Sequence, residues 1–140
     1  MVAKIKPMVY AYVVRSDVME KRIVVAGCRN YYNYEEANVF IEYCIKKNCP
    51  NDTVILLSGG CRGADALGER YAKENGLSVE YYPAEWEKYG KAAGPIRNQI
   101  MVDNCDYVVC FWDNKSKGTK SLINYTKKTG KPLFVKIIGE

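Results

Sequence analysis

The chain has 140 residues, of which 48% are hydrophobic and 26% charged, and its net charge is +5. This length fits a single domain, and the composition is too apolar for a disordered protein. No apolar run approaches the roughly 20 residues that span a bilayer, and the N-terminal segment lacks the features of a signal peptide. We therefore expect a cytoplasmic protein that makes no membrane contact.

The absence of histidine and the pattern of cysteines narrow the possible chemistry further. Without histidine, the chain contains neither a Ser-His nor a Cys-His catalytic pair. The six cysteines form no CxxC pair, so we expect free thiols, no metal site and no cofactor. The modest positive charge suits an anionic ligand but does not by itself indicate nucleic-acid binding.

The first predicted strand is a β-branched apolar run at residues 21–26, typical of a strand buried on both faces. Residues 1–20 before it are predicted to form an arm or an extra strand. A capping-box pattern at Asn33 and Glu36 predicts a helix that closes near Asn48.

The rest of the chain repeats this alternation of strand and helix. Further strands are predicted at residues 53–57, 78–82, 106–112 and 132–138. Helices are predicted from Ala64 to Asn75, from Pro95 onward and up to Gly130, with a loop at residues 83–94. Residues 21–140 are thus predicted to form one α/β domain, a Rossmann-like, doubly wound and mainly parallel sheet of about five core strands.

Ligands of such sheets bind beyond the carboxyl ends of the strands, where helix N-termini present free N–H groups and a partial positive charge. The segments that follow the predicted strands contain unusual residues. No catalytic residue is assigned, and the predicted ligand-binding residues are Gly27, Arg29, Ser58, Gly59, Gly60, Arg62, Gly63, Asp65, Trp86, Arg97, Asn98, Lys117, Gly118 and Thr119.

A glycine-rich turn is the most informative of these segments. Gly59, Gly60 and Gly63 are predicted to let backbone N–H groups cradle an anion, and the alternative is a tight turn without a ligand. The turn matches neither a Walker A motif nor GxGxxG, which disfavours a P-loop ATPase or a dinucleotide dehydrogenase. Arg97 in the first turn of its helix indicates an anionic partner. Thr119 is either a second anion contact or a helix cap.

The other candidates also have two interpretations each. Trp86 either stacks on a base or packs against the sheet edge. Asp65 either complements the helix dipole or contacts a ribose. Asn98 bonds either a loop backbone or a sugar hydroxyl, and Arg29 and Arg62 are either phosphate ligands or solvated surface.

Five segments together resemble the YspA/YpsA-related branch of the SLOG superfamily, over about Lys21 to Ile138. They are RIVVAGCRNYYN, SGGCRGADALGERYA, PAEWEKYGKAAGPIRNQIM, DYVVCFWD and SKGTKSLI. The superfamily is similar in fold to DprA and the Lonely Guy phosphoribohydrolases. The resemblance implies binding, and in some members processing, of nucleotides or NAD-derived molecules, and it also implies a homodimer or larger oligomer.

The resemblance to the phosphoribohydrolases is incomplete at their catalytic motifs. Arg97 is similar to the arginine of one motif, and Gly118-Thr119 to the GT of PGGxGTxxE. Leu122 stands where that motif has its glutamate, which disfavours a simple transfer of the hydrolase activity. Candidate replacements for the carboxylate are Asp65, Glu85, Glu87 and Asp113.

The leading functional hypothesis is a module that binds a nucleotide or an ADP-ribose-like molecule, as a sensor or, if virus-encoded, as a sequestering protein. One alternative is a hydrolase of an N-glycosidic or phosphate bond, which a pocket carboxylate near the ribose site would support. Another is DprA-like nucleic-acid binding, which needs a continuous basic face. Nucleic acid is not the expected partner, and enzymatic activity stays open.

Overall fold

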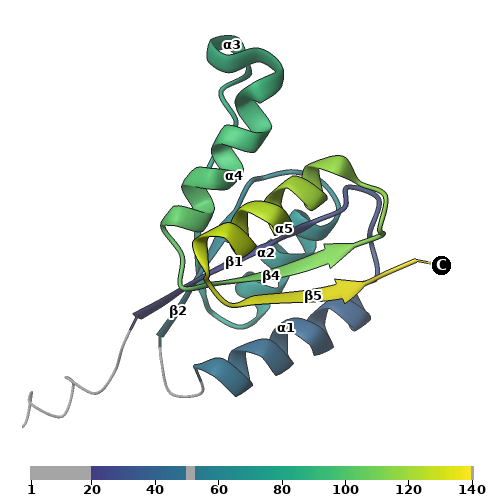
Figure 1. Ribbon diagram of the computed structural model, residues 1–140. Coiled ribbons are helices and arrows are strands. Elements are labelled where there is room, and N and C mark those ends of the chain that lie inside the picture. The colour runs from purple at the N-terminus through teal and green to yellow at the C-terminus, as the bar shows by residue number, and fades with distance from the viewer. Residues whose placement is uncertain (1–19, 50–52, 140) are drawn as a thin grey trace, which may run out of the picture.

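The computed structural model describes residues 20–49 and 53–139. They form an α/β fold around a five-stranded sheet in the order β3-β2-β1-β4-β5 (Figure 1). All neighbouring strands pair in parallel, which confirms the predicted Rossmann-like fold. The strands are β1 (Glu20–Gly27), β2 (Thr53–Ser58), β3 (Ser78–Tyr81), β4 (Tyr107–Trp112) and β5 (Leu133–Ile137). The helices are α1 (Tyr34–Asn48), α2 (Ala64–Glu74), α3 (Trp86–Tyr89), α4 (Ala93–Asp103) and α5 (Lys117–Thr129), with a 3-10 turn at Gly90–Ala92.

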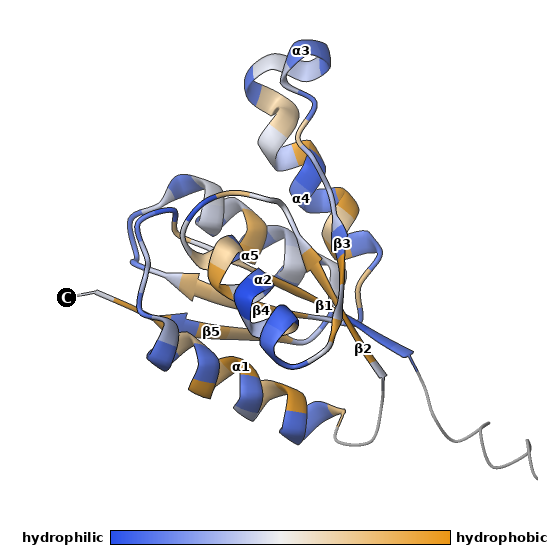
Figure 2. Cartoon of the chain, turned by 180° about the vertical axis from the view of Figure 1, so that it is seen from behind, coloured by the Kyte–Doolittle hydropathy of each residue, from blue (hydrophilic) through white to orange (hydrophobic). Residues whose placement is uncertain are grey.

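The two faces of the central strand β1 supply two hydrophobic cores. Ile23 and Val25 point to one face, where they pack with buried residues of α1 and α2. Val24 and Ala26 point to the other face, where α4 and α5 cover them. The apolar run of β1 is therefore continuous because the strand is buried on both sides. Figure 2 shows the same arrangement, with hydrophobic strands at the centre and mixed hydropathy along the helices.

Most helix ends agree with the sequence-based predictions. Asn33 caps α1 by accepting the N–H of Glu36 at 3.1 Å. Glu36 is the other member of the predicted capping box, and its carboxylate accepts the Tyr31 hydroxyl at 2.7 Å. Gly130 ends α5 with a left-handed φ of 81°, the conformation that glycine adopts most easily.

The loop predicted at residues 83–94 was wrong in part, because it contains α3 and the 3-10 turn, and α4 begins at Ala93 rather than Pro95. An α-helix of four residues is too short to show a hydrophobic period, and its cap residue Glu85 makes no side-chain cap bond. The predicted arm at residues 1–20 lies outside the described residues, except for Glu20, which opens β1.

Helix α4 is held at its C-terminal end and stands away from the sheet at the other. Figure 1 shows α3 and the first part of α4 projecting from the body of the molecule. At the opposite end, Lys131 Nζ donates to the carbonyls of Val102 at 2.7 Å, Asp103 at 3.1 Å and Cys105 at 2.8 Å. A lysine ammonium thus adds a donor for carbonyls at and just after the C-terminal end of the helix, where intrahelical donors run out.

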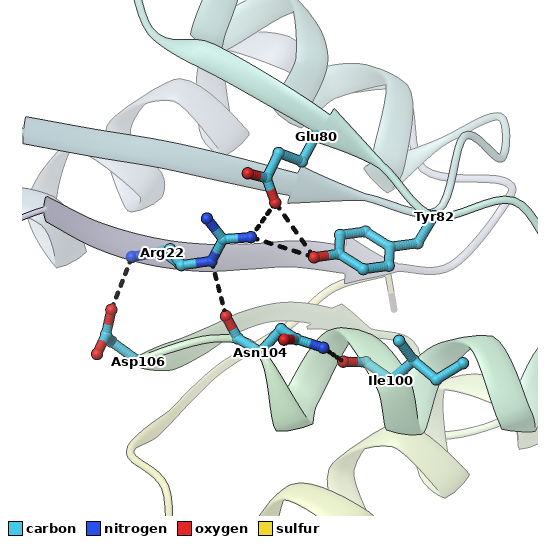
Figure 3. A network of polar contacts seen from close by, with 6 residues as sticks. All are labelled: Arg22, Glu80, Tyr82, Ile100, Asn104 and Asp106. Carbon is cyan, nitrogen blue, oxygen red and sulfur yellow. Dashed lines mark hydrogen bonds and ion pairs between the residues drawn. The ribbon is translucent and has the colours of Figure 1, made fainter.

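Arg22 forms a polar network that ties β1 to β3, two strands away, and to the turn before β4 (Figure 3). Its guanidinium Nη2 donates to the Glu80 carboxylate and to the Tyr82 hydroxyl, the latter at 3.2 Å. Its Nε donates to the carbonyl of Asn104 at 2.9 Å, and its backbone N–H to Asp106 Oδ2 at 2.8 Å. One side chain thereby joins β1, β3 and the turn between α4 and β4.

Arg22→Ala is expected to lower the free energy of unfolding by about 1–2 kcal/mol, because several charge-assisted hydrogen bonds are lost together. The Arg22 and Glu80 side chains are 30% and 37% exposed, so solvent screening keeps the effect below that of a buried pair. Urea denaturation measures it. Lys73→Ala on the exposed surface of α2 is the control, and equal stability of the two variants would contradict a contribution from the network.

Candidate functional site

A cavity of about 440 Å³ opens at the carboxyl edge of the sheet. It lies where β1 and β4 are neighbours but their following helices cover opposite faces, the switch point at which ligands of such sheets bind. Its volume is in the range of small-molecule sites. The lining residues are Ala26, Gly27, Cys28, Arg29, Asn30, Cys61, Arg62, Asp65, Trp86, Gly94, Pro95, Arg97, Asn98, Ser116, Gly118, Thr119 and Leu122.

This cavity brings together most of the residues singled out from the sequence. They come from the end of β1 and from the loops and helices that follow β1, β2, β3 and β4. They are Gly27, Arg29, Arg62, Asp65, Trp86, Arg97, Asn98, Gly118 and Thr119. Gly59 lines an adjoining hollow together with Arg62 and Trp86. The remaining predicted residues, Ser58, Gly60, Gly63 and Lys117, are not part of either lining.

Gly63 faces protein backbone. Its φ is +79°, and a Cβ at this position would lie 2.4 Å from the carbonyl oxygen of Cys28 and 2.5 Å from that of Arg29. The next residue, Ala64, donates its N–H to the same Cys28 carbonyl at 3.0 Å. Gly63 therefore lets the turn before α2 rest directly on the loop after β1, and it fixes the relative position of two cavity walls.

Gly59 makes room for two charged side chains. A Cβ at Gly59 would lie 2.7 Å from Arg97 Nη1 and 2.9 Å from Asp65 Oδ2. Arg97 is only 7% exposed, and its Nη1 donates to the carbonyls of Gly59 at 2.7 Å and Tyr82 at 3.2 Å. The buried guanidinium thus braces the glycine-rich turn against the end of β3.

The other nitrogens of Arg97 differ in their partners. Nε donates to Asn98 Oδ1 at 2.9 Å, which gives Asn98 an internal role. Nη2 contacts only the sulfur of Cys61, at 3.8 Å, within the described residues. Because Arg97 and Cys61 both line the cavity, this nitrogen is the part of the guanidinium with most capacity for an anionic ligand.

The backbone of the glycine-rich turn is largely satisfied inside the protein. Gly60 donates its N–H to Ser58 Oγ at 3.0 Å, and Cys61 donates its N–H to Asp65 Oδ2 at 3.2 Å. Ser58 Oγ in turn donates to Glu69 Oε2 at 2.6 Å. These bonds hold the turn in shape without an anion, so a phosphate cradle formed by its N–H groups stays a prediction.

Asp65 is the buried carboxyl group of the cavity, and it is 5% exposed. Burial raises its pKa to about 6, although the Cys61 N–H and the positive charge of Arg97 both act to lower the pKa. A carboxyl group with this pKa exchanges its proton close to neutral pH, as general acids and bases do. Glu85, Glu87 and Asp113, the other candidate carboxylates, do not line this cavity.

The N-terminus of α5 forms the opposite wall. Its cap residue is Ser116, so Thr119 lies inside the first turn and is not the cap. Ser116 Oγ donates to Asp113 Oδ2 at 3.1 Å and contacts Cys28 Sγ at 3.3 Å. Asp113 Oδ1 accepts the N–H groups of Lys115 and Ser116 at 2.8 Å each, and these bonds lower its pKa to about 2. First-turn N–H groups of a helix have no acceptor within the helix and attract anions.

Several lining residues were missed in the sequence. Cys28 and Cys61 were expected only to be free thiols, and Leu122 was singled out only for its place at the glutamate of the phosphoribohydrolase motif. Asn30 and Ser116 stand beside predicted residues, so their position after a strand was the available signal. Each of the six cysteines, all within the described ranges, is unpaired.

In residues 20–49 and 53–139, no three Cys, Asp or Glu side chains gather as metal ligands would. None of the helices in these ranges combines the length and the apolar composition needed to cross a membrane.

Comparison with known proteins gives the family. The model of the family described as "YspA, cpYpsA-related SLOG family" matches residues 21–89. The Gene 61 protein of Mycobacterium phage D29 is 35% identical over 87 residues, which cover 58% of this chain and 70% of that protein. The chain belongs to the YspA/cpYpsA-related SLOG family.

Two solved structures share the fold of this SLOG protein. DNA processing protein A (DprA) from Streptococcus pneumoniae superposes with a TM-score of 0.64 at 19% identity, over 87% of this chain and 51% of that chain. The structural genomics target TM1055 superposes with a TM-score of 0.56 at 21% identity, over 82% of this chain and 72% of that chain. The SLOG chain thus spans about half the length of the DprA chain.

Proposed function

We propose that this SLOG protein binds a nucleotide or an ADP-ribose-like molecule in the cavity at the carboxyl edge of its sheet, as a sensor or a sequestering protein. The observation that carries the proposal is the convergence of residues from the segments after four separate strands on one cavity at the strand switch point. The phage relative keeps the sequestering role open for a virus-encoded member.

The chemistry of the lining supports a phosphorylated ligand. Arg29, Arg62 and Arg97 supply guanidinium groups, which pair with phosphate oxygens through charge-assisted hydrogen bonds. The N-terminus of α5 adds a partial positive charge beside them. Trp86 is 52% exposed at the rim, and an exposed indole offers a flat surface on which a base can stack.

The direct test is a panel of nucleoside mono- and diphosphates, cyclic nucleotides, NAD and ADP-ribose, followed by thermal shift and calorimetry. A ligand at about 100 times its Kd stabilises the folded state by about 2.7 kcal/mol, which raises Tm by several degrees for a domain of this size. Inorganic phosphate is expected to bind far more weakly, because it lacks the base and the ribose. The proposal is wrong if no member of the panel binds at millimolar concentration.

A second function, hydrolysis of an N-glycosidic or phosphate bond, is supported by Asp65. The chain has Leu122 where the phosphoribohydrolase motif has glutamate, but a buried carboxyl group with a pKa of about 6 lines the same cavity as Leu122. Such a group can hold or release a proton at neutral pH, as hydrolysis requires. Product analysis of each panel ligand by chromatography separates binding alone from turnover.

Asp65→Asn is expected to change stability and turnover in opposite directions. Because burial raises the pKa of Asp65 from 3.8 to about 6 in the folded protein, the protonated carboxyl is the form that folding favours. Its stabilising contribution is present below about pH 4 and is lost as the pH rises to about 6. The variant should therefore match the parent near pH 4 and exceed it at pH 7 by about 1–3 kcal/mol.

Urea denaturation at several pH values measures this difference, with Asp103→Asn on α4 as the control. A parent and an Asp65→Asn variant with equal pH profiles would contradict a raised pKa. If the protein is a hydrolase, the variant should also bind its ligand and fail to cleave it. Unchanged turnover in the variant would remove Asp65 from the chemistry.

A further inference from the structure

Helix α5 differs from the other long surface helices in its charge. Its sequence, KGTKSLINYTKKT, contains lysines and no acidic residue, and the chain has no Asp or Glu anywhere between residues 114 and 139. By contrast, α1 and α2 mix glutamates with lysines or arginines along their length. On those helices, acidic and basic side chains form ion pairs such as Lys46 with Glu42 and Arg70 with Glu74.

The lysines of α5 lie on one exposed face. Lys117, Lys120, Lys127 and Lys128 are all exposed, as are Ser121 and Asn124 between them. At about 100° per residue, these positions fall within roughly one third of the helix circumference. The opposite face, with Leu122 and Ile123, is buried against the sheet. The exposed face therefore presents a row of ammonium groups about 16 Å long, from Lys117 to Lys128.

This row is not neutralised by the protein around it. None of its lysines has an ion-pair partner within residues 20–49 and 53–139. The nearby acidic groups have other partners: Asp103 accepts the Tyr125 hydroxyl at 2.7 Å, and Asp113 accepts backbone N–H groups. Lys131 and Lys136, which follow α5, do have internal partners. Among the lysines of residues 115–136, those without an acidic or carbonyl partner in the described part of the chain are therefore the four of the helix and Lys115 just before it.

We infer that the exposed lysine row of α5 binds the phosphate backbone of a polynucleotide, without base specificity. A polynucleotide carries phosphates at regular short spacing, and ammonium groups in a row neutralise several of them at once. The row contains only lysine, serine and asparagine. It offers no exposed apolar or aromatic side chain of the kind that anchors a protein partner or inserts into a lipid surface. This inference does not rest on the proposed function of the cavity.

The test is a charge-matched pair of triple variants in the full chain. The α5 variant is Lys120→Gln/Lys127→Gln/Lys128→Gln, which leaves Lys117 beside the cavity untouched. The control is Lys46→Gln/Lys47→Gln/Lys73→Gln, on exposed positions of α1 and α2. Both variants lose the same net charge, so they separate a defined binding face from general attraction. Circular dichroism checks that each variant is folded.

Binding is measured by fluorescence anisotropy with a labelled DNA duplex and a single strand of mixed sequence, between about 50 and 200 mM KCl. The parent is expected to bind at low salt, and the α5 variant to lose about tenfold or more in affinity. For the α5 variant, the slope of log affinity against log salt should become shallower by about three, one for each lysine removed. The control should stay within about twofold of the parent. Whether duplex or single strand binds more tightly then identifies the form of polynucleotide.

Three results would overturn the inference. One is no binding of either DNA by the parent at about 50 mM KCl. Another is an equal loss of affinity in both triple variants, which would reduce the effect to net charge. The third is binding of poly-glutamate as tight as that of DNA with the same loss in the α5 variant, which would assign the row to an acidic protein partner. Loss of DNA binding with unchanged nucleotide binding in the cavity would keep the two sites distinct.

Discussion

Gly63→Ala is expected to lower the free energy of unfolding by about 2–5 kcal/mol, a large part of a small domain's stability. A side chain in the left-handed region costs about 1–2 kcal/mol, and here the new Cβ would also meet the backbone of Cys28 and Arg29 at 2.4–2.5 Å. Two backbone segments must separate to admit it, and overpacking of this kind adds about 1–3 kcal/mol. Gly63→Val, with a β-branched side chain, should leave little folded protein and no ligand binding.

Gly60→Ala is a matched control for Gly63→Ala. Gly60 has nearly the same φ, +77°, but no atom lies within 4 Å of the position of its Cβ. Gly60→Ala should therefore lower the free energy of unfolding only by the cost of the left-handed conformation, about 1–2 kcal/mol. Urea denaturation of both variants isolates the contribution of the close backbone approach. Equal losses would mean that the loops move apart easily and that Gly63 is needed for its φ alone.

Arg97→Ala is expected to weaken ligand binding by about ten- to more than a hundredfold, because a charge-assisted hydrogen bond contributes about 1.5–3 kcal/mol. It should also lower stability, since the carbonyls of Gly59 and Tyr82 lose their donor in a buried setting. Arg97→Lys should restore little of the lost affinity or stability. An ammonium group lacks the fixed, forked geometry with which the guanidinium reaches both carbonyls and Asn98. Calorimetry with the best ligand of the panel measures affinity.

Two controls make the Arg97 result interpretable. Lys127→Ala, at the far end of α5 from the cavity, should leave small-ligand affinity within about twofold, because it is remote from the carboxyl edge of the sheet. Denaturation without ligand gives the stability of Arg97→Ala separately, so binding is compared at a temperature where every variant is folded. Full-strength binding by a folded Arg97→Ala protein would remove Arg97 from the site.

The regular part of the fold followed from hydrophobic pattern alone. The β-branched runs at β1, β2 and β4 are buried on both faces, and such strands leave a continuous apolar signature that needs no knowledge of neighbours. The segment from Trp86 to Ala92 left no such signature, because its short helical turns project from the body and bury almost no side chain. Where a segment buries few side chains, its hydrophobic pattern says little about its secondary structure.

The candidate site was predictable in position but less so in detail. Parallel topology alone brings the strand ends together, which is why residues as distant as Gly27 and Thr119 could be assigned to one site before the structure was known. The role of each glycine could not be predicted in this way. A glycine indicates that a Cβ is excluded, but only the structure identifies the excluding group: backbone at Gly63, and the Arg97 and Asp65 side chains at Gly59.

The central position of β1 determines when the sheet can be completed during synthesis. β1 pairs with β2 on one side and with β4 on the other, and the second pairing joins Ile23 to Tyr107. A ribosome adding about 5–20 residues per second therefore exposes a half-built sheet for several seconds before β4 emerges. During that interval the edge of β1 that will pair with β4 is unpaired. Val24 and Val25 lie on this edge, which becomes the middle of the finished sheet. The core and the cavity both need β4 and α5, so neither can be completed until these late elements have been synthesised.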